Sequence, residues 1–241
     1  LKAQGHDVIN LSFGEPDFQT PEHIKEAAKR AIDEGYTFYT PVAGYPELRE
    51  AISQKFKREN NLNYTADQII VSTGAKHSIM NVVLALVNPG DEVIIPSPFW
   101  VSYAEMVKHA EGIPVFIDTQ VDADFKINAE QLENVINNKS KLFMFSSPCN
   151  PTGSVYTQSE LEKLAEVFRK YPNIYILSDE IYEHINFGEK HYSIASIPDL
   201  YDRVITVNGV SKGFAMTGWR IGYIGAAKEI AWACEKIQGQ F

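Results

Sequence analysis

The chain has 241 residues, which is enough for one large α/β domain or two small ones. Its hydrophobic fraction of 44% and charged fraction of 22% are ordinary for a globular protein. The formal net charge of −9 argues against a nucleic-acid partner, because such a partner needs a basic face. No hydrophobic run approaches the ~20 residues that span a membrane.

The first part of the chain predicts a short strand followed by a helix. Residues 8–13 alternate in polarity as a strand does, and residues 14–18 form a turn marked by glycine and proline. Thr20 is expected to cap a helix that has Pro21 at its first position. Gly35 follows the helical pattern and is expected to close this helix.

From residue 46 onwards, helices alternate with short hydrophobic strands. Strands are expected over residues 68–72, 92–96, 113–118, 141–146, 174–178, 204–208 and 221–226. Helices are expected over residues 46–60, 77–87, 129–137, 160–171 and 228–238, with another that ends near residue 109; Thr157 and Glu160 predict a capping box. Hydrophobic strands that alternate with helices indicate a three-layer α/β fold, in which a mainly parallel sheet has helices on both faces.

One lysine and one arginine follow the strand at residues 204–208. Lys212 lies in a turn of glycine and small residues, where open α/β sheets bind ligands. A desolvated lysine amine can form a Schiff base with a carbonyl group, and the fork of Arg220 suits a phosphate. The pair suggests a ligand with an aldehyde and a phosphate, which describes pyridoxal phosphate. Each residue alone is more often a solvated surface charge.

Two earlier strand ends carry residues that suit the same ligand. Gly74, Ala75 and Lys76 form a strand-to-helix turn whose free N–H groups and helix dipole favour a phosphate. Many turns of this kind bind nothing, so the turn alone is weak evidence. Trp100 follows the next strand and offers an aromatic face to a flat ring, although a tryptophan of the core would look the same.

Two later strand ends complete the pattern. Asp179 ends a strand, where a carboxylate can keep a pyridine nitrogen protonated and so strengthen the ring as an electron sink. Tyr182 lies three residues further on, on the same face if the turn is helical. Without a ligand, Asp179 is equally well a helix cap, and Asn150 in an Asn-Pro pair is equally well an ordinary turn residue.

The order of these motifs resembles the class I aminotransferases, a pyridoxal-phosphate-dependent family of fold type I. Within that family the sequence is most similar to bacterial aspartate aminotransferases. The matching motifs are GEPDF, YTPVAGYPELR, NPTG, SDEIY and SKGFAMTGWRIGY, and together they cover essentially the whole chain. The resemblance implies a large domain with a seven-stranded, mainly parallel sheet over residues 39–241. It also implies that residues 1–38 belong partly to a small domain built from both termini.

The resemblance further implies how the cofactor is held. Lys212 would form the internal aldimine with pyridoxal phosphate and then move the proton between the substrate Cα and the cofactor. Asp179 would pair with the pyridine nitrogen, Tyr182 would contact O3′ and Trp100 would stack on the ring. The phosphate would be held by Arg220 with the turn of Gly74, Ala75 and Lys76. No metal is implied.

The substrate and a partner subunit are implied in the same way. Asn150 would contact O3′ and the substrate carboxylate, which the backbone of Gly14 would also face, and Trp100 would be a further substrate-binding residue. Tyr39 would reach the phosphate of a neighbouring subunit, so that sites form across a homodimer. The expected function is the transfer of an amino group from an L-amino acid, with aspartate as the first expectation, to a 2-oxo acid.

Two departures from the family pattern stand out. Gly209 occupies the position, three residues before Lys212, at which many relatives have a phosphate-binding serine. The family's arginine for the substrate carboxylate lies in the C-terminal small domain, beyond Phe241. We therefore expect the sequence to be part of a longer protein, and these 241 residues alone to bind cofactor but to transaminate poorly.

Two other functions stay open. A lyase or synthase on the same scaffold would use the same lysine, aspartate and tyrosine, and it would release ammonia without an amino acceptor. A non-catalytic module that senses pyridoxal phosphate would need a DNA-binding segment, and the charge of −9 argues against that. The two cysteines, Cys149 and Cys234, suggest no disulfide framework and fit a cytoplasmic protein. No residue is assigned to recognition of the substrate side chain.

Overall fold

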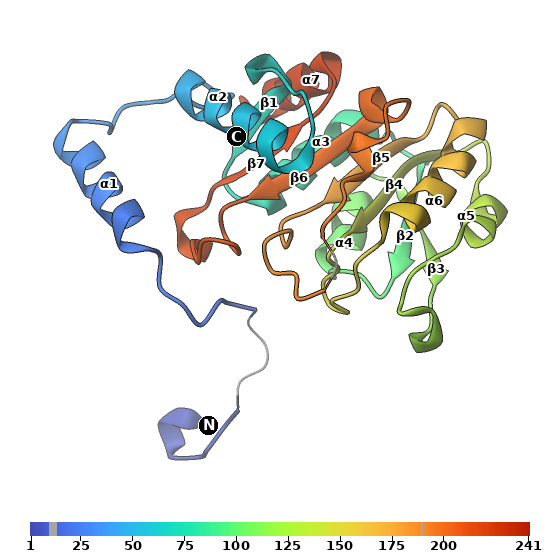
Figure 1. Ribbon diagram of the computed structural model, residues 1–241, viewed down its shortest axis with the longest axis horizontal. Helices are drawn as coiled ribbons and strands as arrows, with labels where there is room; N and C mark the ends of the chain where they lie inside the picture. Colours follow the sequence, from blue (N-terminus) through green and yellow to red (C-terminus); the bar gives the residue numbers. More distant parts are fainter. Residues whose placement is uncertain (10–13, 189) are drawn as a thin grey trace.

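A seven-stranded sheet forms the centre of the computed structural model, which describes residues 1–9, 14–188 and 190–241 (Figure 1). The order across the sheet is β1-β7-β6-β5-β4-β2-β3. The strands are β1 (Ile69–Ser72), β2 (Glu92–Ser97), β3 (Ile113–Asp118), β4 (Ser140–Ser146), β5 (Tyr175–Asp179), β6 (Val204–Gly209) and β7 (Gly222–Gly225). Strand β7 runs antiparallel to β1 and β6, and every other pair is parallel. The predicted mainly parallel sheet is confirmed. Residues 10–13 of the strand expected over 8–13 lie outside the described part of the chain.

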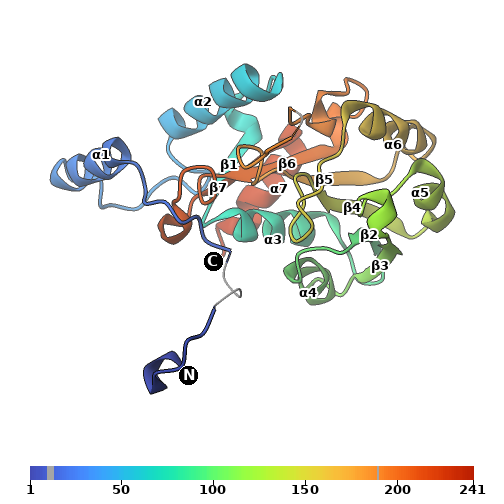
Figure 2. The same cartoon turned by 60° about the horizontal axis from the view of Figure 1, so that its bottom comes forward.

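Helices cover both faces of the sheet, as Figure 2 shows. They are α1 (Glu22–Asp33), α2 (Pro46–Lys55), α3 (Ala75–Leu86), α4 (Ser102–His109), α5 (Ala129–Val135), α6 (Gln158–Lys170) and α7 (Lys228–Gln238). Helices α2, α5 and α6 pack on one face, and α3, α4 and α7 pack on the other. Among the described residues, none of these helices has the length and hydrophobicity needed to cross a membrane.

The alternation of side chains along the strands builds the two hydrophobic layers. In β4, Phe143 faces the layer beneath α2, α5 and α6, whereas Leu142 and Met144 face the opposite layer. All three are completely buried. The ring of Phe143 lies 5.2 Å from that of Phe145 and 5.3 Å from that of Phe168 in α6, measured between centroids. Because both faces are covered, hydrophobic residues stand at consecutive positions of this strand instead of alternating with polar ones.

Helix α1 stands clear of the three layers in both ribbon views (Figures 1 and 2). It contains no buried residue. The predicted cap of this helix is wrong, because Pro21 is its N-cap residue and no side chain caps it. The Thr20 hydroxyl instead donates to the carbonyl oxygen of Ala215 at 2.6 Å, a contact between distant parts of the chain that sequence spacing does not indicate.

The other helix boundaries agree with expectation in most cases. The capping box of Thr157 and Glu160 is present at the start of α6. The helix expected over residues 46–60 is α-helical only to Lys55 and continues as a π-helical turn over Phe56–Asn60. Helix α5 ends two residues earlier than expected, at Val135.

The register of the parallel strands places their carboxyl ends at one edge of the sheet. Ser146 of β4 lies opposite Asp179 of β5, and Asp179 lies opposite Val207 of β6. Strand β7 begins at the same edge because it is antiparallel to β6, with Gly222 opposite Gly209. The polar residues singled out in the sequence therefore meet along this edge, which we call the carboxyl edge.

Replacement of Phe143 by alanine tests the central packing. We expect a loss of about 3–5 kcal/mol in the free energy of unfolding, because the cavity would be left between the rings of Phe145 in β4 and Phe168 in α6. The measurement is a denaturant titration. Phe187→Ala is the control, since that side chain is 99% exposed and should change stability by no more than about 0.5 kcal/mol. Equal losses in the two variants would contradict this view of the core.

Candidate active site

A cavity of about 690 Å³ opens at the carboxyl edge. Its wall comes from three parts of the chain, which are residues 14–19, the turn after β5 with Tyr182, and the loop of Lys212 to Ala215. Tyr182 also lines a neighbouring hollow of about 530 Å³ that contains Asn150. The two spaces share Tyr182, Ile185 and Phe187 as lining residues, so they adjoin along the turn after β5.

Lys212 projects into the larger cavity from the loop between β6 and β7. Its ammonium group donates a hydrogen bond to the carbonyl oxygen of Gly14 and lies 5.6 Å from the centre of the Tyr182 ring. Burial lowers the pKa of Lys212, the positive charge of Arg220 lowers it further, and Glu15 opposes the change. A lowered pKa increases the share of neutral, nucleophilic amine near neutral pH.

Asp179 is a buried carboxylate at the end of β5. Only 5% of the residue is exposed, and burial raises its pKa to about 6. Its Oδ2 accepts a hydrogen bond of 2.6 Å from the hydroxyl of Tyr103, and its Oδ1 accepts one of 3.3 Å from the backbone N–H of Ile181. Both bonds oppose the rise in pKa, whereas the neighbouring charge of Glu180 adds to it. A buried anion of this kind is a natural partner for a cation inside the site.

Tyr182 lies between the lysine and the buried carboxylate. Burial raises the pKa of its hydroxyl, and the charge of Asp179 raises it further. A side-chain hydrogen bond with Asn150 acts in the opposite direction. The amide and the phenol therefore form a pair of polar groups from the ends of two neighbouring strands.

Trp100 contacts both Tyr103 and Lys76 beside these groups. The rings of Trp100 and Tyr103 meet edge to face, with centroids 5.6 Å apart and an interplanar angle of 87°. The ammonium group of Lys76 lies 5.0 Å from the centre of the Trp100 ring, within reach of a cation–π contact. Trp100 is half-buried, so part of its surface is open to the site.

Arg220 lies against the turn that starts α3. Its Nη1 donates to the carbonyl oxygen of Thr217 at 2.8 Å, and its Nη2 donates to that of Thr73 at 3.4 Å. Gly74 has a φ of +87°, and a Cβ atom there would lie 2.2 Å from Arg220 Nη2. The absence of a side chain therefore lets the guanidinium approach the free N–H groups of the helix, an arrangement suited to an anion.

The structure explains why glycine stands at position 209. A Cβ atom there would lie 2.8 Å from the carbonyl oxygen of Ile221 and 3.0 Å from Gly222 Cα. A serine would therefore push β6 away from β7. The hydroxyl that many relatives are expected to use is excluded here by the close approach of the two strands.

The segment of residues 14–20 is tied to the loop that carries Lys212. Thr217 donates to a carboxylate oxygen of Glu15 at 2.9 Å, and the indole nitrogen of Trp219 donates to the Thr20 hydroxyl at 3.1 Å. With the bond from Lys212 to Gly14, these contacts join residues about 200 positions apart in the sequence. One wall of the cavity is thus supplied by the N-terminal part of the chain.

The structure brings almost all of the predicted residues together. Those linked in one contiguous set of contacts are Gly14, Gly74, Ala75, Lys76, Trp100, Asn150, Asp179, Tyr182, Lys212 and Arg220. Tyr39 is not among them, because its side chain is fully exposed. Sequence reasoning missed Tyr103, although its position three residues after Trp100 is the spacing of neighbours on a helix.

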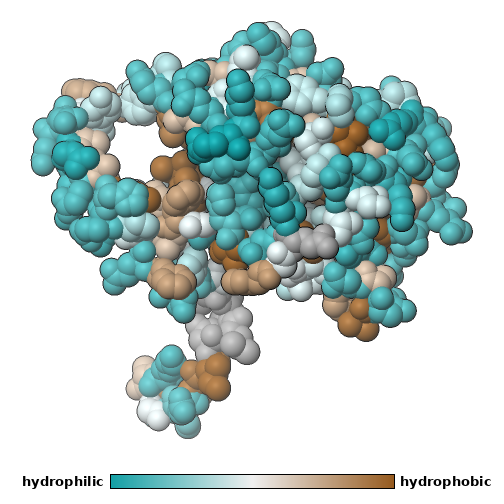
Figure 3. Space-filling view, viewed as in Figure 1, coloured by the Kyte–Doolittle hydropathy of each residue, from teal (hydrophilic) through white to brown (hydrophobic). Residues whose placement is uncertain are grey.

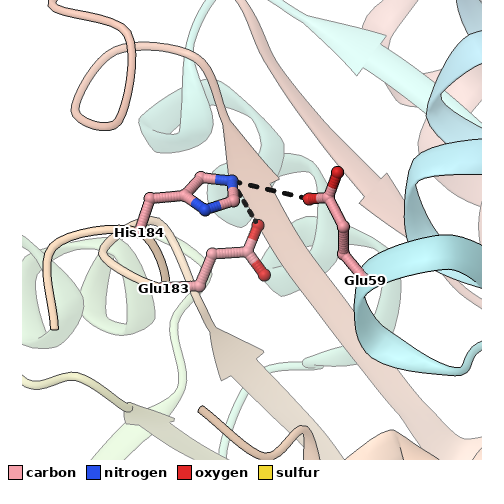
Figure 4. A group of neighbouring side chains, drawn as sticks. All are labelled: Glu59, Glu183 and His184. Atoms are coloured by element: carbon pink, nitrogen blue, oxygen red, sulfur yellow. Dashed lines mark ion pairs between the residues drawn. The ribbon is translucent and has the colours of Figure 1, made fainter. Parts of the chain in front are cut away.

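A cluster of charged side chains lies beside the site (Figure 4). The His184 Nε2 atom is 3.6 Å from Glu59 and 3.4 Å from Glu183. The ligand atoms of these three residues lie within 4.8 Å of one another, as in a metal site. However, Glu183 already pairs with Lys55 and accepts a bond of 2.7 Å from Asn60. The cluster is therefore a network of ion pairs that holds the turn after β5 in place.

Replacement of Gly222 by alanine tests the close contact at the start of α3. The new Cβ would lie 2.1 Å from the backbone nitrogen of Ala75 and 2.4 Å from Gly74 C, so the turn must move. We expect about 1–3 kcal/mol less stability in a denaturant titration, together with weaker binding of a phosphate-bearing ligand. Gly218→Ala is the matched control, because a Cβ there meets nothing within 4 Å. The idea fails if the two variants behave alike.

A family model described as aminotransferase class I and II matches residues 6–241. Among curated relatives, the chain is 54% identical to a probable aspartate/prephenate aminotransferase of Rickettsia bellii, with 100% of this chain and 61% of the relative covered. It is 52% identical to the aspartate/prephenate aminotransferase of Nitrosomonas europaea, again covering 100% of the chain and 61% of the relative. The chain thus spans less than two thirds of the length of these relatives.

Solved structures agree with this likeness. The aspartate aminotransferase of Thermus thermophilus with maleate superposes with a TM-score of 0.96 and 45% identity, over 99% of this chain and 62% of the other. The aspartate aminotransferase of Rhizobium meliloti gives a TM-score of 0.97 and 46% identity, over 99% and 60%. The expected fold type and the expected family are confirmed. The chain belongs to the class I and II aminotransferases.

Proposed function

We propose that the protein is a pyridoxal-phosphate-dependent aminotransferase that moves an amino group from L-aspartate to a 2-oxo acid. The observation that carries the proposal is the meeting of Lys212, Tyr182 and Asp179 at the carboxyl edge, beside a cavity large enough for cofactor and substrate. The names of the relatives support aspartate as the amino donor. They also support prephenate, which is itself a 2-oxo acid, as an acceptor.

The residues present fit pyridoxal phosphate. The Arg220 guanidinium lies directly against Gly74 at the start of α3, and a guanidinium beside free N–H groups of a helix suits a phosphate. Lys212 supplies an amine of lowered pKa, and Asp179 supplies a buried carboxylate that lacks a cationic partner among the bonds of the described residues. When bound, the cofactor supplies an electron sink for the charge that develops at the substrate Cα.

Lys212 has two tasks in this proposal. Its neutral amine attaches the cofactor covalently, which the lowered pKa favours. With cofactor and substrate bound, Lys212 Nζ would take the proton from the substrate Cα and would return it at C4′ of the cofactor. General acid–base catalysis of this kind is typically worth roughly 10²–10⁴-fold in rate.

The other residues orient and hold charge. Asp179 would favour a proton on the ring nitrogen, because a buried carboxylate is stabilised by a cation beside it. Tyr182 and Asn150 would offer their polar groups to the phenolic oxygen of the ring, and Asn150 would also bind the substrate carboxylate. Trp100 is half-buried and would offer the open part of its ring for stacking.

A second subunit is part of the proposal. Tyr39 is fully exposed and Phe38 is 83% exposed, in a segment that leads from α1 to α2. In Figure 3 the visible face is largely hydrophilic, but hydrophobic atoms border the hollow between the outlying N-terminal segment and the body of the molecule. We propose that this segment packs in a homodimer, with Tyr39 reaching the partner's phosphate site. Residues 1–38 would then belong partly to a small domain, with Gly14 facing the substrate carboxylate.

A cytoplasmic location completes the proposal. Cys149 and Cys234 are both free thiols, as is usual in a reducing compartment. Cys234 is buried, and burial raises its pKa to about 12, so this thiol stays protonated and unreactive.

The attachment of the cofactor is tested by Lys212→Ala. We expect this variant to bind pyridoxal phosphate without a covalent link, so that borohydride treatment adds no mass to the protein. Lys108→Ala, a change at an exposed lysine in α4, should be labelled like the unaltered protein. A stable, reducible link in Lys212→Ala would show that another lysine carries the cofactor.

The amino donor is tested with the full-length protein and no amino acceptor. Aspartate should convert the bound cofactor to its amine form, as seen by loss of its absorption band near neutral pH, faster than aromatic or branched amino acids do. One equivalent of 2-oxo acid per site should appear. Continuous release of ammonia under these conditions would instead identify a lyase and refute the transaminase proposal.

A further inference from the structure

Tyr103 makes an unusual contact for a core tyrosine. It lies in the first turn of α4, and only 1% of the residue is exposed. Its hydroxyl reaches across to the end of β5 and donates to Asp179 Oδ2 at 2.6 Å. A bond of this length between a hydroxyl and a carboxylate is typical of a strong, charge-assisted hydrogen bond.

Few groups other than Tyr103 stabilise a negative charge on Asp179. Among the hydrogen bonds of the described residues, Tyr103 is its one side-chain donor, and the backbone N–H of Ile181 adds a longer bond of 3.3 Å. The groups that surround this pair do not help. Glu180 repels the charge, Tyr182 and Cys149 bring no positive charge, and Ser146 lowers the pKa of the Tyr103 hydroxyl rather than that of the carboxyl group.

The position of the Tyr103 ring is itself fixed. Its edge-to-face contact with Trp100 spans 5.6 Å, and its backbone N–H donates to the carbonyl oxygen of Trp100 at 2.9 Å. The ring and the backbone of Tyr103 are therefore both held by Trp100, and together they fix the position of the hydroxyl. One residue thus joins the aromatic stacking surface to the buried carboxylate.

We propose that Tyr103 is a positioning residue of the site, whose hydroxyl fixes the charge and the orientation of the Asp179 carboxylate toward the ring nitrogen of the cofactor. This inference rests on the proposed function. Tyr103 does not reach the reacting atoms in this arrangement and acts through Asp179. Without it, the carboxylate loses its shortest bond and becomes easier to protonate, so it no longer favours a protonated ring.

The sign of the pH effect follows from the burial of Asp179. Burial raises the pKa of Asp179 to about 6, and the bond from Tyr103 opposes that rise. Removal of the hydroxyl therefore moves the pKa upward, and the carboxyl group becomes neutral over a wider range of pH. As the pH falls, cofactor binding that depends on an ionised Asp179 is then lost at a higher pH in the variant than in the unaltered protein.

The test is Tyr103→Phe, which keeps the ring and its contact with Trp100 but removes the hydroxyl. The pKa of Asp179 is measured in the full-length apoprotein by the ¹³C chemical shift of its carboxyl carbon, assigned with Asp179→Asn. The dissociation constant of pyridoxal phosphate is then measured between pH 5 and pH 9. We expect the carboxyl pKa to rise and the dissociation constant to increase roughly tenfold near pH 7, with a smaller difference at high pH.

Tyr64→Phe is the matched control. Tyr64 is equally buried, and its hydroxyl is hydrogen-bonded to Thr206 at 3.1 Å rather than to a site residue. This variant should lose similar stability but leave both the Asp179 pKa and cofactor binding unchanged. A purely structural role for Tyr103 predicts the same result for Tyr103→Phe, and that result would overturn the inference.

The measurements separate this inference from the proposed function. If the unaltered protein does not bind pyridoxal phosphate, the proposed function fails, whereas the effect on the carboxyl pKa still reports on the Tyr103–Asp179 bond. If the unaltered protein binds the cofactor but Tyr103→Phe moves neither the pKa nor the pH dependence of binding, the role of Tyr103 is refuted and the function stands.

Discussion

Strands β4, β5 and β6 run parallel with Ser146, Asp179 and Val207 level across the sheet, so the chain must leave all three at the same edge. Nearly every polar residue of the site depends on this register. A slip of one residue in β5 would turn Asp179 to the other face of the sheet and separate it from Tyr103. The hydrophobic packing on both faces, with residues such as Phe143 enclosed by rings, resists such a slip. The packing of the core therefore also fixes the geometry of the site.

The ionisable groups of the site are poorly compensated by other groups of the protein itself. Burial raises the pKa of Asp179 and lowers that of Lys212, so each group is held away from its preferred charged state. Arg220 leaves its guanidinium exposed beside free N–H groups of α3. A ligand with a basic ring nitrogen, an aldehyde and a phosphate would suit all three groups at once. Perturbed groups gathered in one cleft are typical of catalytic sites.

Close backbone contacts decide how the proposed phosphate site is built. Gly74, Gly209 and Gly222 each lie where a Cβ atom would meet another group at 2.8 Å or less. These contacts draw β6, β7 and the start of α3 together, and they bring Arg220 over the turn. The same closeness leaves no room for a serine at position 209. In the proposed function, the phosphate would therefore be held by backbone N–H groups and a guanidinium, an arrangement that this packing permits.

The sequence by itself determined the layered α/β fold and the strand ends at which the chemistry lies, because hydrophobic runs and turn residues are local signals. The motif order also indicated roles for Lys212 and Asp179. Only the tertiary structure decided that Tyr103 bonds to Asp179, that Thr20 bonds to Ala215 instead of capping α1, and that the segment near Gly14 forms a wall of the cavity. Such contacts join residues far apart in the chain, and their geometry depends on strand register and helix packing, which no local pattern records.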